Sequence, residues 1–211
     1  MSHPEPPPNL HGERPAQAAT VLLLIDVIND FAFPEAELLL RHARPMAKRI
    51  AELKRGAQTA GIPVIYVNDN FGRWRSDFRA TVEHCSRPDS LGREIVTLLH
   101  PGPDDYFVLK PKHSAFYCTT LDILLRDLQT RRVILTGVAG DICVLFTAND
   151  AYMRGLELVV PADCIASETT DKTAMALEQM RTLLRADVRP AAEIRWDTLA
   201  EEPHWPDWPD G

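Results

Sequence analysis

Cysteine and long apolar runs are scarce in this 211-residue chain. The four cysteines, at 85, 118, 143 and 164, form no Cys-x-x-Cys pair, so a disulfide framework or a structural zinc site has little support. No apolar run exceeds the five residues of 21–25, whereas a membrane-spanning helix needs roughly 20. The opening MSHPEPPPNL lacks the basic and apolar parts of a signal peptide. We therefore expect a cytoplasmic protein that does not bind membranes.

Cations are also in short supply. Lys and Arg number 23 against 30 Asp and Glu, a net charge of -7, which argues against nucleic acid as a partner because phosphate binding needs a surplus of cations. A content of 45% hydrophobic and 25% charged residues excludes a disordered protein. The length indicates one domain. We place it at residues 20–197, between a proline-rich N-terminal tail at 1–19 and a C-terminal tail at 198–211 that contains PHWPDWPDG.

Short apolar runs alternate with longer amphipathic segments between these tails. This pattern is typical of an α/β fold, and we predict a three-layer αβα arrangement with a mostly parallel, six-stranded, doubly wound sheet. Strands are predicted at 20–26, 63–68, 106–109, 133–136 and 156–159, with a weaker last strand near 188 or at 193–196. Helices are predicted at 35–60, with a break or kink at Pro45, and at 90–99, 119–129, 142–154 and 171–185. Such sheets bind ligands at the carboxyl ends of their strands.

Three chemically capable residues follow predicted strands. Asp26 ends the first strand, Lys110 ends the third, and Cys143 lies in the first turn of the helix after the fourth. Considered one at a time, each has an ordinary structural interpretation: Asp26 as a turn cap, Lys110 as a solvated cation and Cys143 as a small core residue. Taken together, the positive end of the helix dipole and a nearby ammonium would lower the pKa of the thiol, so a thiolate nucleophile would exist near neutral pH.

The segment GVAGDIC between the fourth strand and this helix supports the same interpretation. Gly137 and Gly140 allow backbone N–H groups to approach a substrate, as an oxyanion hole requires, and Asp141 is predicted to cap the helix through its side chain. The dinucleotide fingerprint G-x-G-x-x-G is absent, so NAD binding is unsupported. We expect no cofactor.

The segments LLLIDVINDF, KPKHSAFYCTTLDILL, VILTGVAGDICVLFTANDAYMRG and VVPADCIAS, in this order and spacing, resemble the isochorismatase-like cysteine hydrolases, which include nicotinamidase and N-carbamoylsarcosine amidase. The resemblance covers about residues 20–190 and is most specific in the third segment. It implies a catalytic triad of Asp26, Lys110 and Cys143, with Lys112 as the alternative lysine. It also implies a homo-oligomer and a small-molecule substrate.

The resemblance assigns two backbone features to the same region. An oxyanion hole would be formed by the backbone N–H groups of Ala139 and Cys143. A cis peptide bond would join Val138 to Ala139.

One departure from the family pattern concerns a metal. Nicotinamidases hold a divalent cation with an Asp and two His after the second strand, but NDNFGRWRSDF supplies Asp69 and no histidine until His84. We therefore expect no metal and disfavour nicotinamide. Isochorismatases lack the cysteine, so Cys143 disfavours vinyl-ether cleavage. The resemblance thus favours hydrolysis of an amide, imide or ureido C–N bond through a Cys143 thioester. An isochorismatase-type ether hydrolase and a non-catalytic binding protein are the alternatives.

Five residues are candidates for the substrate pocket: Asn29, Phe31, Asp69, Trp74 and His113. The first two belong to an aromatic-rich loop after the first strand, and His113 belongs to the family-like motif. The long segment 69–87 mixes aromatic residues with arginines and shows no clear element until its end. We interpret it either as a substrate lid or as a loop pinned to the core by its aromatic side chains.

Overall fold

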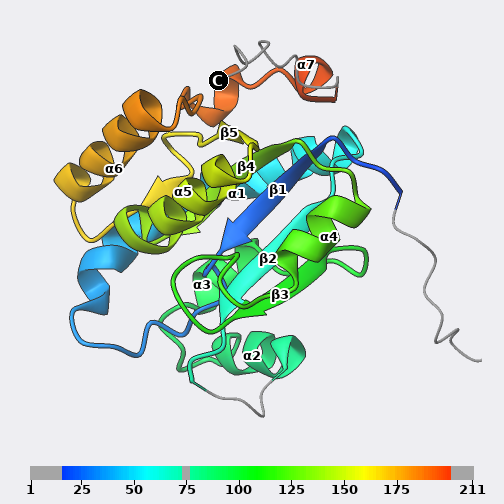
Figure 1. Ribbon diagram of the computed structural model, residues 1–211. Coiled ribbons are helices and arrows are strands. Elements are labelled where there is room, and N and C mark those ends of the chain that lie inside the picture. The colour runs from blue at the N-terminus through cyan, green and yellow to red at the C-terminus, as the bar shows by residue number, and fades with distance from the viewer. Residues whose placement is uncertain (1–15, 73–76, 201–211) are drawn as a thin grey trace, which may run out of the picture.

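The computed structural model describes residues 16–72 and 77–200. Its centre is a parallel sheet in the order β3-β2-β1-β4-β5, and a sixth strand, β6, pairs with β4 (Figure 1). The strands are β1 Thr20–Ile25, β2 Val64–Asp69, β3 Tyr106–Lys110, β4 Arg132–Val138, β5 Glu157–Val159 and β6 Ile165–Ala166. Every residue of β1 and β4 is buried, because helices cover both faces of the sheet. The predicted α/β architecture with a parallel six-stranded sheet is confirmed.

Helices cover the two faces of the sheet and enclose two hydrophobic clusters. α1 and α3 pack on one face, and α4, α5 and α6 pack on the other (Figure 1). α1 runs continuously through Pro45, where a break or kink was expected. The helical segments are α1 Ala36–Thr59, α2 Phe78–Cys85, α3 Arg93–Leu98, α4 Leu121–Asp127, the π-helical η1 Gly140–Val144, α5 Leu145–Met153, α6 Thr170–Leu183, the 3-10 η2 Ala191–Glu193 and α7 Trp196–Ala200.

The sixth strand is not where the sequence placed it. The region near 188 makes only an isolated bridge between Val159 and Asp187, residue 193 ends η2, and residue 196 begins α7. β6 instead pairs Ile165 and Ala166 with the last residues of β4. A strand of two residues has no alternating pattern that a sequence could show.

The C-terminal end of the folded domain also differs from the prediction. Leu199 is buried in a core cluster, and its carbonyl accepts hydrogen bonds from Thr20 Oγ1 at 2.6 Å and from Arg132 Nη1 at 3.1 Å. At the other end, the Ala18 N–H donates to the Leu128 carbonyl at 2.7 Å. The packed domain therefore extends through α7, past the boundary at 197, and begins before residue 20. Among the described residues, no helix combines the length and apolarity needed to cross a membrane.

Candidate active site

Asp26 leaves β1 in the left-handed backbone region, with φ of 53°. This turn aims its carboxylate at the neighbouring strands. Oδ1 accepts the Asp69 N–H at 2.7 Å, and Oδ2 lies 2.8 Å from Lys110 Nζ. The side chain is buried. β2 and β3, the next two strands of the sheet, therefore supply the partners of this acid.

Lys110 ends β3 and is fully buried. Its Nζ lies 2.8 Å from the Asp26 carboxylate and 3.6 Å from Cys143 Sγ, and it donates to the backbone carbonyl of Lys112 at 3.2 Å. The Lys112 residue is itself exposed. Of the two lysines that the sequence left open, Lys110 is the one whose ammonium enters the cluster.

Cys143 lies in η1, directly after β4. The peptide bond between Val138 and Ala139 is cis, at the position that the resemblance indicated. The Val144 N–H reaches the Ala139 carbonyl five residues back at 3.1 Å, which defines the wide π turn around the thiol. The thiol thus follows the carboxyl end of β4, the neighbour of β1 in the sheet.

The electrostatics of the cluster contradict the predicted resting thiolate. Burial raises the pKa of the Cys143 thiol to about 12; the Asp26 carboxylate raises it further and Lys110 opposes the rise. Burial also raises the pKa of Asp26 above its ordinary value against the pull of Lys110. Burial alone would lower the pKa of Lys110, but Asp26 raises it, so the ammonium keeps its charge. Burial and the Asp26 carboxylate thus favour the protonated thiol over the thiolate.

Asn29 and Phe31 fix the conformation of the loop after β1. Asn29 Oδ1 accepts the Phe31 N–H at 2.7 Å, which closes a tight turn. Phe31 is buried in a core cluster and its ring lies 6.1 Å from that of Phe33. The large apolar ring of Phe31 therefore anchors the loop in the core, and its role as a pocket wall stays a prediction.

Asp69 and His113 both lie at the edge of the cluster. Asp69 Oδ2 is 3.9 Å from Lys110 Nζ, and its Oδ1 accepts the Phe71 N–H at 2.6 Å. His113 is exposed, with Nδ1 3.9 Å from Cys143 Sγ and its ring 5.6 Å from that of Phe146. Trp74 lies outside the described residues.

Comparison with known proteins identifies the family of the chain. A family model for the isochorismatase domain matches residues 20–193. The chain belongs to the isochorismatase family. The protein is therefore an enzyme, a hydrolase of that family, and its similar proteins include amidohydrolases.

Three similar proteins show how far the likeness extends. The isochorismatase family protein YaaI of Bacillus subtilis is 42% identical over 179 residues, covering 85% of this chain and 98% of the relative. The ureidoacrylate amidohydrolase RutB of Methylorubrum extorquens is 30% identical over 173 residues, covering 69% of this chain and 68% of the relative. The solved N-carbamoylsarcosine amidase of Thermoplasma acidophilum superposes with a TM-score of 0.64 at 28% identity, covering 83% of this chain and 98% of that one.

Asp141 does not cap the helix of this family member through its side chain. The N-cap position is Ala139, with no side-chain cap bond, because the π turn already begins at Gly140. The Asp141 N–H donates to Ser167 Oγ at 3.1 Å, and its carboxylate lies 3.9 Å from Lys172 Nζ. The carboxylate faces α6 instead.

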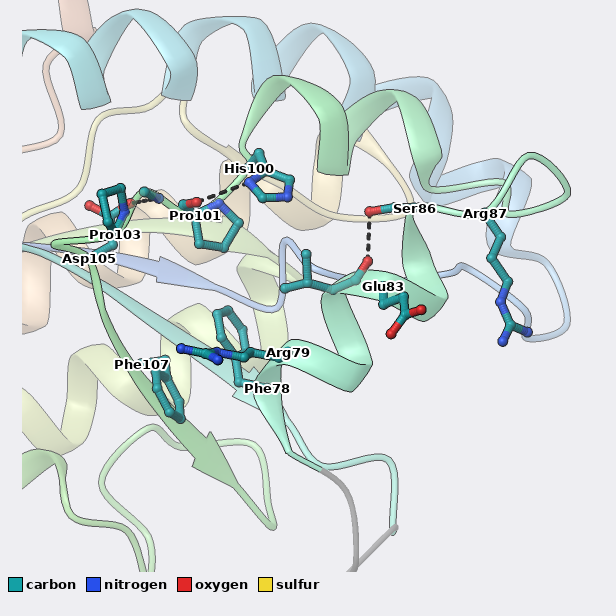
Figure 2. Close-up of a pocket in the computed structure, with 12 residues that line it drawn as sticks. Phe78, Arg79, Glu83, Ser86, Arg87, His100, Pro101, Pro103, Asp105 and Phe107 are labelled. Atoms are coloured by element: carbon teal, nitrogen blue, oxygen red, sulfur yellow. Dashed lines mark hydrogen bonds between the residues drawn. The ribbon is translucent and has the colours of Figure 1, made fainter. Parts of the chain in front are cut away.

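The segment predicted as a lid contains the helix α2. Phe78 stacks on Phe107 of β3, with ring centroids 5.1 Å apart. A separate groove of about 610 Å³ lies between α2 and the chain entering β3, and Arg79 and Arg87 are among its lining residues (Figure 2). These two arginines thus border a groove that contains none of the triad residues. The alternative to a lid was a loop attached to the core by its aromatic side chains. Phe78 makes such an attachment, because it is buried in a core cluster.

Asn68 was not among the predicted site residues, but it connects β2 to the loop that follows Asp26. It is fully buried and exchanges two hydrogen bonds with Ile28: its Nδ2 donates to the carbonyl at 2.8 Å and its Oδ1 accepts the N–H at 3.1 Å. This pair ties the loop after Asp26 to β2. The sequence does contain a signal for this role. Asn68 directly follows the apolar run VIYV, and an amide at the end of a buried strand needs hydrogen-bond partners.

The described residues contain no group of three or more His, Cys, Asp or Glu side chains placed to hold a metal ion.

Proposed function

We propose that this protein is a cysteine hydrolase that cleaves the C–N bond of a small amide, imide or ureido compound through a thioester on Cys143. One observation carries the proposal. The Lys110 ammonium lies 2.8 Å from the Asp26 carboxylate and 3.6 Å from the Cys143 sulfur, so an acid, a cation and a nucleophile meet at one point. The three residues come from the ends of β1 and β3 and the turn after β4, which is the edge where parallel sheets bind ligands.

In the first step, Asp26 accepts the thiol proton as the sulfur attacks the substrate carbonyl carbon. The S–C bond forms, and the electron pair of the C=O double bond moves to oxygen. The N–H groups of Ala139 and Cys143 bind this oxyanion, and each well-aimed donor contributes on the order of 3 kcal/mol. Lys110 stabilises the negative charge as it moves from carboxylate to sulfur.

In the second step, the oxyanion reforms the C=O bond and the C–N bond breaks. Asp26 returns the proton to the leaving nitrogen, which leaves a thioester on Cys143. Water then attacks the thioester while Asp26 accepts one of its protons. The C–S bond breaks, the acid departs, and the proton returns to sulfur. The raised pKa of Asp26 suits a carboxyl group that alternates between base and acid.

Ureido compounds are the favoured substrate class. Two similar proteins are named as hydrolases of such molecules, a ureidoacrylate amidohydrolase and an N-carbamoylsarcosine amidase. At the edge of the cluster, Asp69 provides an acceptor and His113 a ring nitrogen. These groups match the N–H and C=O of a urea.

The test is intact-mass detection of an acyl adduct during incubation with ureido acids, primary amides and imides. We expect an adduct on Cys143, and its loss together with turnover in Cys143→Ala. Cys118→Ala, which removes an exposed cysteine, is the matched control and should keep both. A Cys143→Ala enzyme with a tenth of the activity would overturn the covalent route. Vinyl-ether cleavage that survives this change would indicate an ether hydrolase, and an absence of both adduct and turnover would favour a binding protein.

A further inference from the structure

The groove between α2 and the chain that enters β3 is separate from the catalytic cluster (Figure 2). Its volume of about 610 Å³ falls in the range of pockets that hold small molecules. Pro101 and Phe107 line it at the amino end of β3, whereas Lys110 reaches the cluster from the carboxyl end of the same strand. A molecule bound in the groove therefore leaves the thiol of Cys143 free.

A buried lysine holds one wall of the groove in place. Lys54 of α1 donates to the His100 carbonyl at 3.1 Å, and its Nζ lies 2.6 Å from the Asp105 carboxylate. Asp105 also accepts the Gly102 N–H at 2.7 Å. The side chains of this ion pair are 10% and 5% exposed, so little water competes for them. These bonds fix the turn from His100 to Asp105, so this wall is preformed and the charge of Asp105 is already neutralised.

The groove also contains a flat aromatic surface. The Phe107 ring stacks almost parallel on the buried Phe78 ring, with an interplanar angle of 8°, yet Phe107 is 55% exposed. Val82 and Pro101 add apolar surface beside it. Aromatic rings prefer to stack in offset pairs, so the exposed part of Phe107 suits a planar ligand.

The charges of the groove come from α2 and the residues that follow it. Arg79 and Glu83 lie one turn apart on one face of α2, and Arg87 follows the end of the helix. Among the described residues, these three side chains have no hydrogen-bond or ion-pair partner. Two guanidinium groups against one free carboxylate leave an excess of one positive charge. In Figure 2, Arg79 extends from α2 toward Phe107.

We propose that this groove binds a small aromatic carboxylate, with its ring on Phe107 and its carboxylate on Arg79. A guanidinium group binds a carboxylate through two parallel hydrogen bonds, which fixes the orientation of the ligand. The excess positive charge favours an anion over a neutral or cationic molecule. The free carboxylate of Glu83 disfavours a second negative charge on the ligand, such as that of a phosphate dianion.

The first experiment is a calorimetric titration of the full chain with 2-naphthoate as the probe. We expect binding to the wild type, at least tenfold weaker binding to Arg79→Gln, and similarly weak binding of the neutral 2-naphthylmethanol. Arg93→Gln on α3 is the matched control, because Arg93 is also exposed but lies outside the groove. Unchanged circular dichroism shows that each variant folds. No binding of 2-naphthoate, or equal binding to the wild type and Arg79→Gln, would overturn the proposal.

A second pair of variants locates the ring of the probe. Phe107 and Phe146 are exposed to nearly the same degree, 55% and 53%, but Phe146 lies beside His113 at the catalytic cluster. Phe107→Leu should weaken the binding of 2-naphthoate roughly fivefold, whereas Phe146→Leu should leave it unchanged. The reverse result would place the probe at the catalytic cluster and reject the groove. Neither titration measures turnover, so both results are independent of the proposed thioester chemistry.

Discussion

Asp26 and Lys110 form an ion pair of 2.8 Å inside the protein, and the lysine side chain has no exposed surface. Two charges removed from water are costly unless each compensates the other. The pair therefore couples the chemistry of the cluster to the stability of the fold.

Lys110→Met should abolish turnover and also destabilise the protein, because it leaves the Asp26 carboxylate buried without its cation. Breaking a buried pair in this way costs about 3–5 kcal/mol. Urea unfolding measures the loss. Lys112→Met changes the exposed neighbour and should stay within about 0.5 kcal/mol of the wild type. A Lys110→Met protein as stable as this control would show that the pair contributes nothing to folding.

Asp26→Asn should make Cys143 more reactive toward alkylation while it stops turnover. The carboxylate helps to raise the pKa of the thiol to about 12, so its removal leaves Lys110 free to stabilise the thiolate. A fall of one pKa unit gives roughly a tenfold faster reaction with iodoacetamide at pH 8. Peptide mass spectrometry follows the rate, with the exposed Cys118 as an internal control that should not change. Slower alkylation of Cys143 would contradict the assigned electrostatics.

Gly137→Ala should disrupt the pairing of β1 with β4. Gly137 has φ of +116°, and a methyl group there would lie 2.0 Å from the Ile25 carbonyl oxygen. We expect a loss of about 3 kcal/mol or more in the free energy of unfolding. Gly61→Ala is the control, since Gly61 also has positive φ but has no atom within 4 Å of the added group. Its cost should be about 1 kcal/mol, from backbone strain alone. Equal losses would mean that the close approach to Ile25 is unimportant.

The Asp30–His84 contact predicts a pH dependence of stability. Partial burial would raise the pKa of Asp30, but the Ala32 N–H and His84, at 2.8 Å, hold it below its ordinary value. A carboxyl group whose pKa is lower in the folded than in the unfolded chain stabilises the fold at any pH above its unfolded pKa. That stabilisation is lost as the pH falls through its pKa in the folded protein. Asp30→Asn should therefore be less stable than the wild type at pH 6, by about 1 kcal/mol or less for an exposed pair. Urea unfolding at several pH values measures the difference in the free energy of unfolding between the two proteins, which should shrink as the pH approaches 3. A difference that stays constant with pH would show that this contact is not its cause.

The sequence predicted best the strands that consist of an unbroken apolar run. The run that ends at Asp26 is buried on both faces, so its place inside the sheet follows from the pattern. The run YFVL that ends at Lys110 also identifies a strand, although β3 lies at the edge of the sheet and is only partly buried. The turn that contains Cys143 was predicted from the motif GVAGDIC. The protonation of its thiol could not be predicted, because the carboxylate that raises its pKa lies 117 positions earlier in the chain.

Short elements were the other source of error. β6 has two residues, and α2 has eight within a segment rich in arginine. α7 spans the predicted end of the domain at residue 197, and buried polar contacts from its Leu199 carbonyl to Thr20 and Arg132 anchor it. Such contacts join residues far apart in the chain and leave no local periodicity.

β1 and β4 are direct neighbours, with Ile25 opposite Gly137. The hydrogen-bonded pairing of these two strands therefore sets the separation of Asp26 and Cys143, which follow β1 and β4. His113 and Phe71 lie on connecting loops. Evolution or an engineer could rewrite these loops to admit new compounds while the reactive atoms keep their spacing. The proposed chemistry and the choice of substrate thus depend on different parts of the structure.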